Sequence, residues 1–250
     1  MNKKYVLPGL ILVFVLVVVC LLELMYYYSQ PVLSDNITSY GVNMPEQYEV
    51  HGIDVSRYQQ KINWTRVSNM RSNGIQPQFV FIKATESNRI IDDSFKYNWQ
   101  LAKDNGLLRG AYHYFTANDD VQKQAEFFCK NTSLISGDLP PVVDVEKLFG
   151  NNPADLRKKL KHFLILLEKQ YHCKPIIYTF TSFYRDFLGN DFNEYPLWVA
   201  HYFQPNSPII NRPWQFWQHS DRGRVDGIKS KVDLNVFNGT TADLNKLLIP

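Results

Sequence analysis

The sequence predicts an α/β fold, an irregular TIM-like βα barrel of about five βα units followed by three helix-poor β-strands. Two observations favour this fold. From Val50 onward, short apolar runs alternate with stretches of helical periodicity, as expected for parallel strands joined by helices. Beyond Phe187 the helical periods stop while the apolar runs continue, so the last third should contain strands joined by loops.

The first five predicted strands are apolar runs rich in β-branched and aromatic residues. They are His51–Val55, Phe79–Lys83, Gly110–Phe115, Pro141–Glu146 and Pro175–Phe180. A helix is expected after each, over Trp64–Ser72, Ser94–Asn105, Val121–Lys130, a segment starting at Pro153, and Ser182–Phe187. The fourth helix has the clearest start, because Asn152 suits an N-cap, Pro153 the first helical position and Asp155 the first turn.

The three remaining strands are expected at Leu197–Tyr202, Trp214–His219 and Val232–Phe237. Active sites of βα barrels lie at the carboxyl ends of the strands. Polar residues recur at those positions in this chain, so the site is expected there.

Composition limits the possible functions. The 250 residues are 45% hydrophobic and 20% charged with a net charge of +3, which fits one domain with an appendage and a monomer. The densest basic run, Arg157–Lys161, lies on a predicted helix whose other face is apolar, so it is interpreted as a solvated face rather than a nucleic-acid site. The histidines have no metal-ligand spacing and no glycine-rich phosphate loop occurs, so neither metal nor cofactor is expected.

The appendage is the N-terminus. Lysines at positions 3 and 4 precede an apolar run over Tyr5–Leu22, and tyrosines follow at Tyr26–Tyr28. A cleaved signal needs small residues at its exit, whereas tyrosines suit a membrane interface. We therefore expect an uncleaved signal-anchor over residues 1–28, with a cleaved signal and a secreted protein as the alternative. A stalk over residues 29–49 and a catalytic barrel over 50–250 would then lie outside the cytoplasm.

Export affects how the cysteines are interpreted. Cys129 is expected to close a helix and Cys173 to precede a strand, and neither has the spacing of a metal ligand. A disulfide between them and two buried free thiols both remain open.

The most informative segment is Val142–Glu146, in which Asp144 and Glu146 interrupt an apolar strand. Side chains alternate along a strand, so both acids point to the same face with Cα atoms about 6.6 Å apart. Like charges at this distance disfavour double ionisation, so one acid should keep its proton near neutral pH. A neutral acid beside a carboxylate is the working pair of a glycosidase. A solvated strand end would explain the same spacing without any chemistry.

Two further acids, Asp54 and Asp233, also lie in or directly after apolar strands. A barrel brings its strand ends together around one mouth, which favours a shared cluster over four unrelated turn residues. Alternation along the strands places other side chains on the inner face: Lys83, Tyr112, Tyr114, Tyr178, Phe180, Trp198 and Tyr202. Together they predict an acidic cleft walled by aromatic rings, which suits a polysaccharide.

These residues resemble glycoside hydrolase family 25, the Chalaropsis-type lysozymes or N-acetylmuramidases. The matching segments follow the family order and span most of residues 50–240. They are Gly52–Ser56, Phe81–Ser87, Gly110–Tyr114, the pair Asp144 and Glu146, Pro175–Tyr178, Leu197–Tyr202, Trp217–Gln218, Val225–Ile228 and Val232–Asn235. The chain departs from the family at Ser87, where glycine is common, and at Phe180, which lacks a tyrosine hydroxyl.

The resemblance implies roles for the acids. Glu146 would protonate the leaving glycosidic oxygen, and Asp144 would assist the substrate 2-acetamido group or act at the anomeric carbon. Asp54 and Asp233 would hold this pair by hydrogen bonds and tune its charge. Lys83, Tyr114 and Phe180 match sugar-contacting positions of the family. The implied substrate is the β-1,4 bond between N-acetylmuramic acid and N-acetylglucosamine in peptidoglycan glycan strands.

Two alternatives compete with this interpretation. A chitinase-like hydrolase would need an aspartate at position 142, where this chain has Val142. A membrane-tethered, catalytically silent wall-binding module would be expected to have lost Asp144 or Glu146, and both are present.

Overall fold

The computed structural model describes Val18 and residues 38–250. The expected signal-anchor, apart from Val18, and the expected stalk up to residue 37 lie outside the described residues. Within the described part of the chain, no helix combines the length and apolar character needed to cross a membrane.

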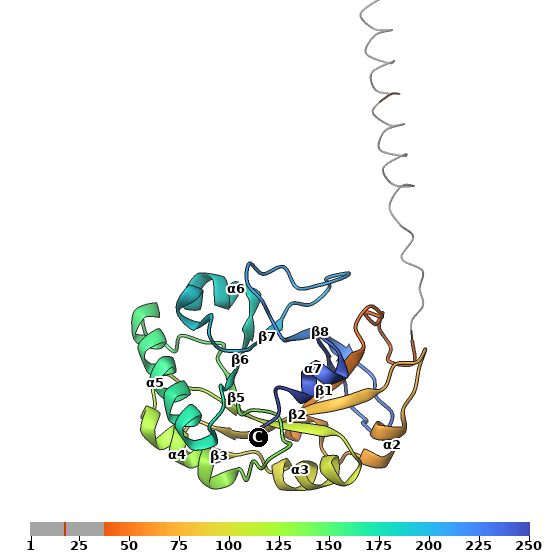
Figure 1. Ribbon diagram of the computed structural model, residues 1–250, viewed down its shortest axis with the longest axis horizontal. Helices are drawn as coiled ribbons and strands as arrows, with labels where there is room; N and C mark the ends of the chain where they lie inside the picture. The colour runs from red at the N-terminus through yellow and green to blue at the C-terminus, as the bar shows by residue number, and fades with distance from the viewer. Residues whose placement is uncertain (1–17, 19–37) are drawn as a thin grey trace, which may run out of the picture. The chain divides into compact units, whose positions relative to one another are not determined.

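The described domain is built around a closed β-barrel (Figure 1). Its strands are β1 (Val50–Val55), β2 (Pro77–Glu86), β4 (Leu108–Tyr114), β5 (Val142–Asp144), β6 (Ile176–Phe180), β7 (Leu197–Ala200), β8 (Phe216–Gly223) and β9 (Val232–Phe237). They follow the order β1-β9-β8-β7-β6-β5-β4-β2, and pairing of β1 with β2 closes the eight-stranded barrel. The short β3 (Ile90–Ile91) extends β2 at its edge. The predicted irregular βα barrel is therefore confirmed.

β9 differs from the other barrel strands in direction. It pairs antiparallel with both β1 and β8, whereas the remaining barrel pairs are parallel. Its first residues, rather than its last, therefore reach the end of the barrel where the parallel strands terminate. This reversal places Asp233 opposite Asp54.

Helices cover the outside of the barrel along its first half. They are α2 (Trp64–Asn69), α3 (Phe95–Asp104), α4 (Val121–Asn131) and α5 (Pro153–Tyr171), which form an arc around the strands in Figure 1. After β6 come the short turns α6 (Thr181–Phe183), η2 (Tyr184–Leu188) and η3 (Gly189–Phe192). α5 begins as predicted, because the Asn152 side chain accepts a hydrogen bond from the Asp155 N–H and Pro153 occupies the first turn.

Strand alternation divides the core into two layers. Val143 and Val145 pack outward among the helices, whereas Val142 packs inside the barrel with the rings of Phe79 and Phe81. These rings require glycines beside them, since a Cβ at Gly52 or Gly110 would lie 2.6 Å from Phe79 or Phe81. Alternation from Val142 also turns Asp144 inward, toward the barrel mouth.

A helix at the end of the chain was not predicted. The short helix α7 (Thr241–Asn245) follows β9, whose last residues lie at the end of the barrel opposite the mouth. Leu244 packs with Val50 and Phe79 inside the barrel, and the Ile249 N–H donates to the Asp138 carbonyl before β5. α7 thus closes the floor with apolar side chains.

Residues 38–49 differ from the expected stalk. Tyr40 and Met44 are buried in the core, and the Tyr40 hydroxyl donates to the Ile75 carbonyl. The Tyr48 hydroxyl donates to the Asn206 carbonyl. Residues 38–49 therefore belong to the compact unit of the barrel, which does not begin near residue 50. Isolated apolar residues in a polar segment have no periodicity, so the sequence did not reveal this packing.

The two cysteines in the described residues are free thiols. Cys129 and Cys173 are both half-buried, and burial raises the pKa of each. The sequence left open a disulfide or two free thiols, and the structure has free thiols.

Candidate active site

The mouth of the barrel gathers the residues that the sequence singled out. Strand register aligns Tyr114, Asp144, Tyr178 and Trp198 in one layer across β4, β5, β6 and β7. Inward-facing residues of neighbouring strands in one layer lie over the same interior space. The predicted acidic and aromatic cluster therefore forms at the carboxyl ends of the parallel strands.

Asp54 and Asp233 face each other across β1 and β9, and their carboxyl groups are hydrogen-bonded. Asp54 Oδ2 also accepts hydrogen bonds of 2.8 Å from Gln218 Nε2 and from Asn235 Nδ2. Burial raises the pKa of Asp54 to about 6, and burial together with the Asp54 charge raises that of Asp233 to about 9. A proton therefore resides on Asp233 at neutral pH and is donated to Asp54.

Asp144 is the last residue of β5, and Glu146 follows two positions later. Asp144 is only 7% exposed, and its Oδ1 has no hydrogen-bond partner within the described residues. Burial, followed by the Glu146 charge, raises the pKa of Asp144 well above its usual range. Burial also raises the pKa of the half-exposed Glu146. The pKa is therefore raised at both acids, whereas the sequence predicted that one of the two keeps its proton.

A cation lies beside this pair. Lys83 Nζ is 2.6 Å from Glu86 Oε2 and 5.0 Å from the centre of the Tyr114 ring. The Lys83 charge lowers the pKa of both Asp144 and Glu146, opposing the effect of burial. Lys83 therefore opposes the effect of burial on the pKa of both acids, and at Glu146 the Lys147 charge does so more strongly.

Aromatic side chains form the wall of the cluster. The Trp198 ring packs against Tyr178 with ring centres 4.4 Å apart and planes tilted by 58°, and it meets Tyr112 edge to face at 6.4 Å. Phe180 and Tyr202 meet edge to face at 6.4 Å. The hydroxyls of Tyr178 and Tyr202 donate to Gln218 Oε1, at 2.8 and 2.7 Å. The aromatic wall and the acids are thus joined through one amide.

Sequence reasoning did not assign Gln218, Asn235 or Glu86 to the site. Asn235 bridges Trp198 Nε1 and Asp54, and Gln218 bridges both tyrosines and Asp54. A signal was available, because each amide follows or interrupts an apolar strand, as the acids do. Ser87, at the departure from the family pattern, has a φ of +56°. This left-handed backbone explains why glycine suits the position.

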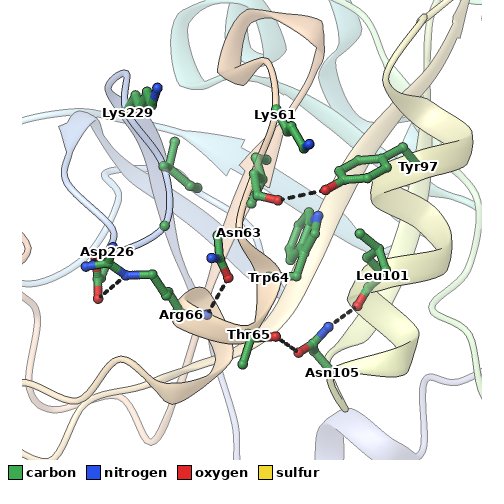
Figure 2. A pocket seen from close by; sticks show the side chains of 13 residues that line it. Lys61, Asn63, Trp64, Thr65, Arg66, Tyr97, Leu101, Asn105, Asp226 and Lys229 are labelled. Carbon is green, nitrogen blue, oxygen red and sulfur yellow. Dashed lines mark hydrogen bonds and ion pairs between the residues drawn. The ribbon is translucent and has the colours of Figure 1, made fainter.

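Clefts lie beside the barrel mouth and along its outer wall. A cleft of about 490 Å³ is lined by Phe180 and Tyr202 together with Arg185 and Ile209. Figure 2 shows another cleft, of about 660 Å³, between α2, α3 and the loop before β9, where Arg66 pairs with Asp226. None of the four acids lines either cleft. Within residues 38–250, no three His, Cys, Asp or Glu side chains are grouped to hold a metal ion.

Comparison with known proteins agrees with this geometry. Residues 53–228 match the family model of the glycosyl hydrolases family 25. Among curated relatives, "Uncharacterized protein YegX" of Escherichia coli (strain K12) is 49% identical over 83% of this chain and 76% of its own length. "Lysozyme M1" of Streptomyces globisporus is 36% identical over 78% of this chain and 70% of its length.

A solved structure supports the same assignment. A family 25 glycosyl hydrolase from Bacillus anthracis superposes with a TM-score of 0.74 at 31% identity, covering 82% of this chain and 95% of that protein. Fold, acid cluster and sequence similarity therefore agree, and the chain belongs to glycosyl hydrolase family 25.

Proposed function

We propose that this family 25 hydrolase cleaves the β-1,4 bond between N-acetylmuramic acid and N-acetylglucosamine in peptidoglycan. Glu146 is the general acid that protonates the leaving oxygen, because it is the less buried acid of the pair and is accessible from the mouth. Asp144 assists the 2-acetamido group of the substrate, whose oxygen attacks the anomeric carbon with retention of configuration. Asp54 and Asp233 act by positioning and by charge.

The observation that carries the proposal is the unpartnered Oδ1 of Asp144. A buried carboxyl oxygen without a hydrogen bond is costly in the free protein. An acetamido N–H of a bound sugar would supply the missing partner and would favour the ionised form of Asp144. The same hydrogen bond would orient the acetamido oxygen for attack while Glu146 retains its proton.

Digestion of purified peptidoglycan tests the reaction. The new reducing ends should be N-acetylmuramic acid, identified by borohydride reduction and mass spectrometry of the fragments. New N-acetylglucosamine reducing ends would indicate a different bond, and the absence of new ends would leave a silent wall-binding module as the alternative. The relative from Streptomyces globisporus is named a lysozyme, which supports the first outcome.

We also propose that the N-terminal segment stays attached and anchors the catalytic domain on the extracytoplasmic side of a membrane. The support is its sequence, an apolar run over Tyr5–Leu22 flanked by lysines and by interfacial tyrosines. Cell fractionation and sequencing of the mature N-terminus test this location. A released protein that starts between Tyr26 and Glu49 would instead show that the segment is a cleaved signal.

A further inference from the structure

Phe203 lies three residues after the end of β7, on the surface and in a backbone conformation that large side chains rarely adopt. The side chain is 74% exposed, and its φ is +59°. This left-handed backbone is unfavourable for a bulky residue and suits glycine or asparagine better. Backbone conformations of this kind are concentrated at ligand-binding positions. The ring contributes little to the core, so its role must be sought toward solvent.

Neighbouring side chains hold the ring in place. The guanidinium of Arg222, from β8, lies over the Phe203 ring, with its carbon 5.1 Å from the ring centre. Tyr202 meets the ring edge to face, with centres 6.5 Å apart and planes at 84°. Arg222 therefore covers one face and Tyr202 stands nearly perpendicular to the ring, while most of the ring surface remains exposed. The result is an oriented aromatic platform.

The platform continues the aromatic wall of the candidate active site. Ring centres follow one another at 6.2 Å from Tyr178 to Phe180, at 6.4 Å from Phe180 to Tyr202 and at 6.5 Å from Tyr202 to Phe203. The line starts at a buried tyrosine that donates to Gln218, which in turn donates to Asp54. It ends at an exposed ring. Aromatic faces thus lead from the acids to the rim.

We propose that Phe203, supported by Arg222, forms an outer sugar-binding subsite on which a saccharide of the glycan strand stacks, beyond the sugars at the acids. This inference rests on the proposed function and adds a preference for long strands. An aromatic face buries the C–H face of a sugar while the hydroxyls stay hydrated. A contact this far from the cleaved bond stabilises ground state and transition state alike, so it lowers KM without changing kcat.

Steady-state kinetics on two peptide-free substrates test the subsite: long glycan strands and a tetrasaccharide of the same repeat. Phe203→Asn removes the ring but tolerates the left-handed backbone. It should raise KM on long strands by about three- to tenfold, with kcat and tetrasaccharide kinetics unchanged. Phe203→Trp should keep the wild-type KM. Ile165→Ala, which alters an exposed apolar side chain on α5, is the matched control and should have no effect.

Thermal denaturation separates binding from a structural role. Phe203→Asn should have a Tm equal to or above that of the wild type, because asparagine relieves the backbone strain. The inference is overturned if KM on long strands is unchanged, or if the variant loses activity equally on both substrates. A wild-type protein that cleaves neither substrate would instead refute the proposed reaction, and the subsite with it.

Discussion

The Asp54 and Asp233 carboxyl groups share a hydrogen bond across two antiparallel strands, although the residues lie at opposite ends of the domain's sequence. The proton in this bond keeps the pair at a single negative charge near neutral pH. Gln218 and Asn235 direct amide hydrogens at the ionised partner. The Asp54 and Asp233 pair therefore sets the negative charge near Asp144 and Glu146, although its strands, β1 and β9, do not pair with β5.

Stability should fall as pH rises from about 4 to 9 because of this pair. The pKa of Asp233 is raised from 3.8 to about 9, so in this range the folded protein holds a proton that the unfolded chain has released. The stabilisation is complete below pH 4 and is lost as pH rises through 9. One such proton gives a slope of about 1.4 kcal/mol per pH unit.

Asp233→Asn should remove about that much of the slope, because an amide still donates to Asp54 but does not titrate. Urea denaturation between pH 5 and 8 measures the difference. A slope identical to that of the wild type would mean that Asp233 does not hold the proton.

Glu146→Gln should abolish proton donation while leaving the fold intact. Glutamine has nearly the same shape and no acidic proton, so turnover of peptidoglycan should fall at least about a hundredfold. Glu126→Gln, on the exposed face of α4, is the control and should be fully active. Near-normal turnover by Glu146→Gln, with an unchanged Tm, would remove Glu146 from its assigned role.

Asp144→Asn should lose activity without losing stability. Burial already favours the neutral form of Asp144, so an uncharged amide fits the site at neutral pH. Activity should fall at least about a hundredfold because the amide cannot become the anion that orients the acetamido group. Thermal denaturation and reducing-end assays measure the two effects, and a large drop in Tm would indicate a structural role instead.

The first product should have the β configuration, because attack by the acetamido oxygen inverts the anomeric carbon and water then inverts it again. Proton NMR of the initial product reads the anomer directly. A thiazoline analogue of the intermediate should inhibit. An α anomer appearing first would rule out retention and favour direct attack by water.

Truncation should distinguish residues 38–49 from a dispensable linker. Tyr40→Ala should cost about 3 kcal/mol of stability, since the ring is buried and its hydroxyl bonds the Ile75 carbonyl. A protein starting at Glu49 should therefore be less stable than one starting at residue 38, and urea denaturation compares the two. Tyr58→Ala, at a 71% exposed ring, serves as control. Equal stability of the two proteins would restore the boundary near residue 50.

The sequence predicted the local features of the fold well. α5 begins where Asn152 and Pro153 place it, and the eight barrel strands coincide with the apolar runs. Local periodicity and capping residues decide such elements. α7 and the packing of Tyr40 were not predicted, because each depends on contacts with distant parts of the chain. β3 was not predicted because a two-residue strand is too short to show an alternating pattern.

The candidate site shows the same division. The acids stood out because a carboxylate interrupts an apolar strand. The amides that hold Asp54 also interrupt apolar strands, but an uncharged amide there does not reveal its partner, and Asp54 is 164 residues from Gln218 and 181 from Asn235. Which polar side chains meet depends on strand register and on the direction of β9, and neither can be read from a single segment. The catalytic roles themselves stay predictions.

The reversed direction of β9 also determines how the enzyme can be joined to other molecules. Because β9 runs away from the mouth, the chain passes through α7 to Pro250 at the floor, where Ile249 is bonded beside β5. A fluorescent protein or a solid support linked after Pro250 would then sit behind the barrel. The opening that receives the polymer would face outward, so the immobilised enzyme should remain accessible to an insoluble wall.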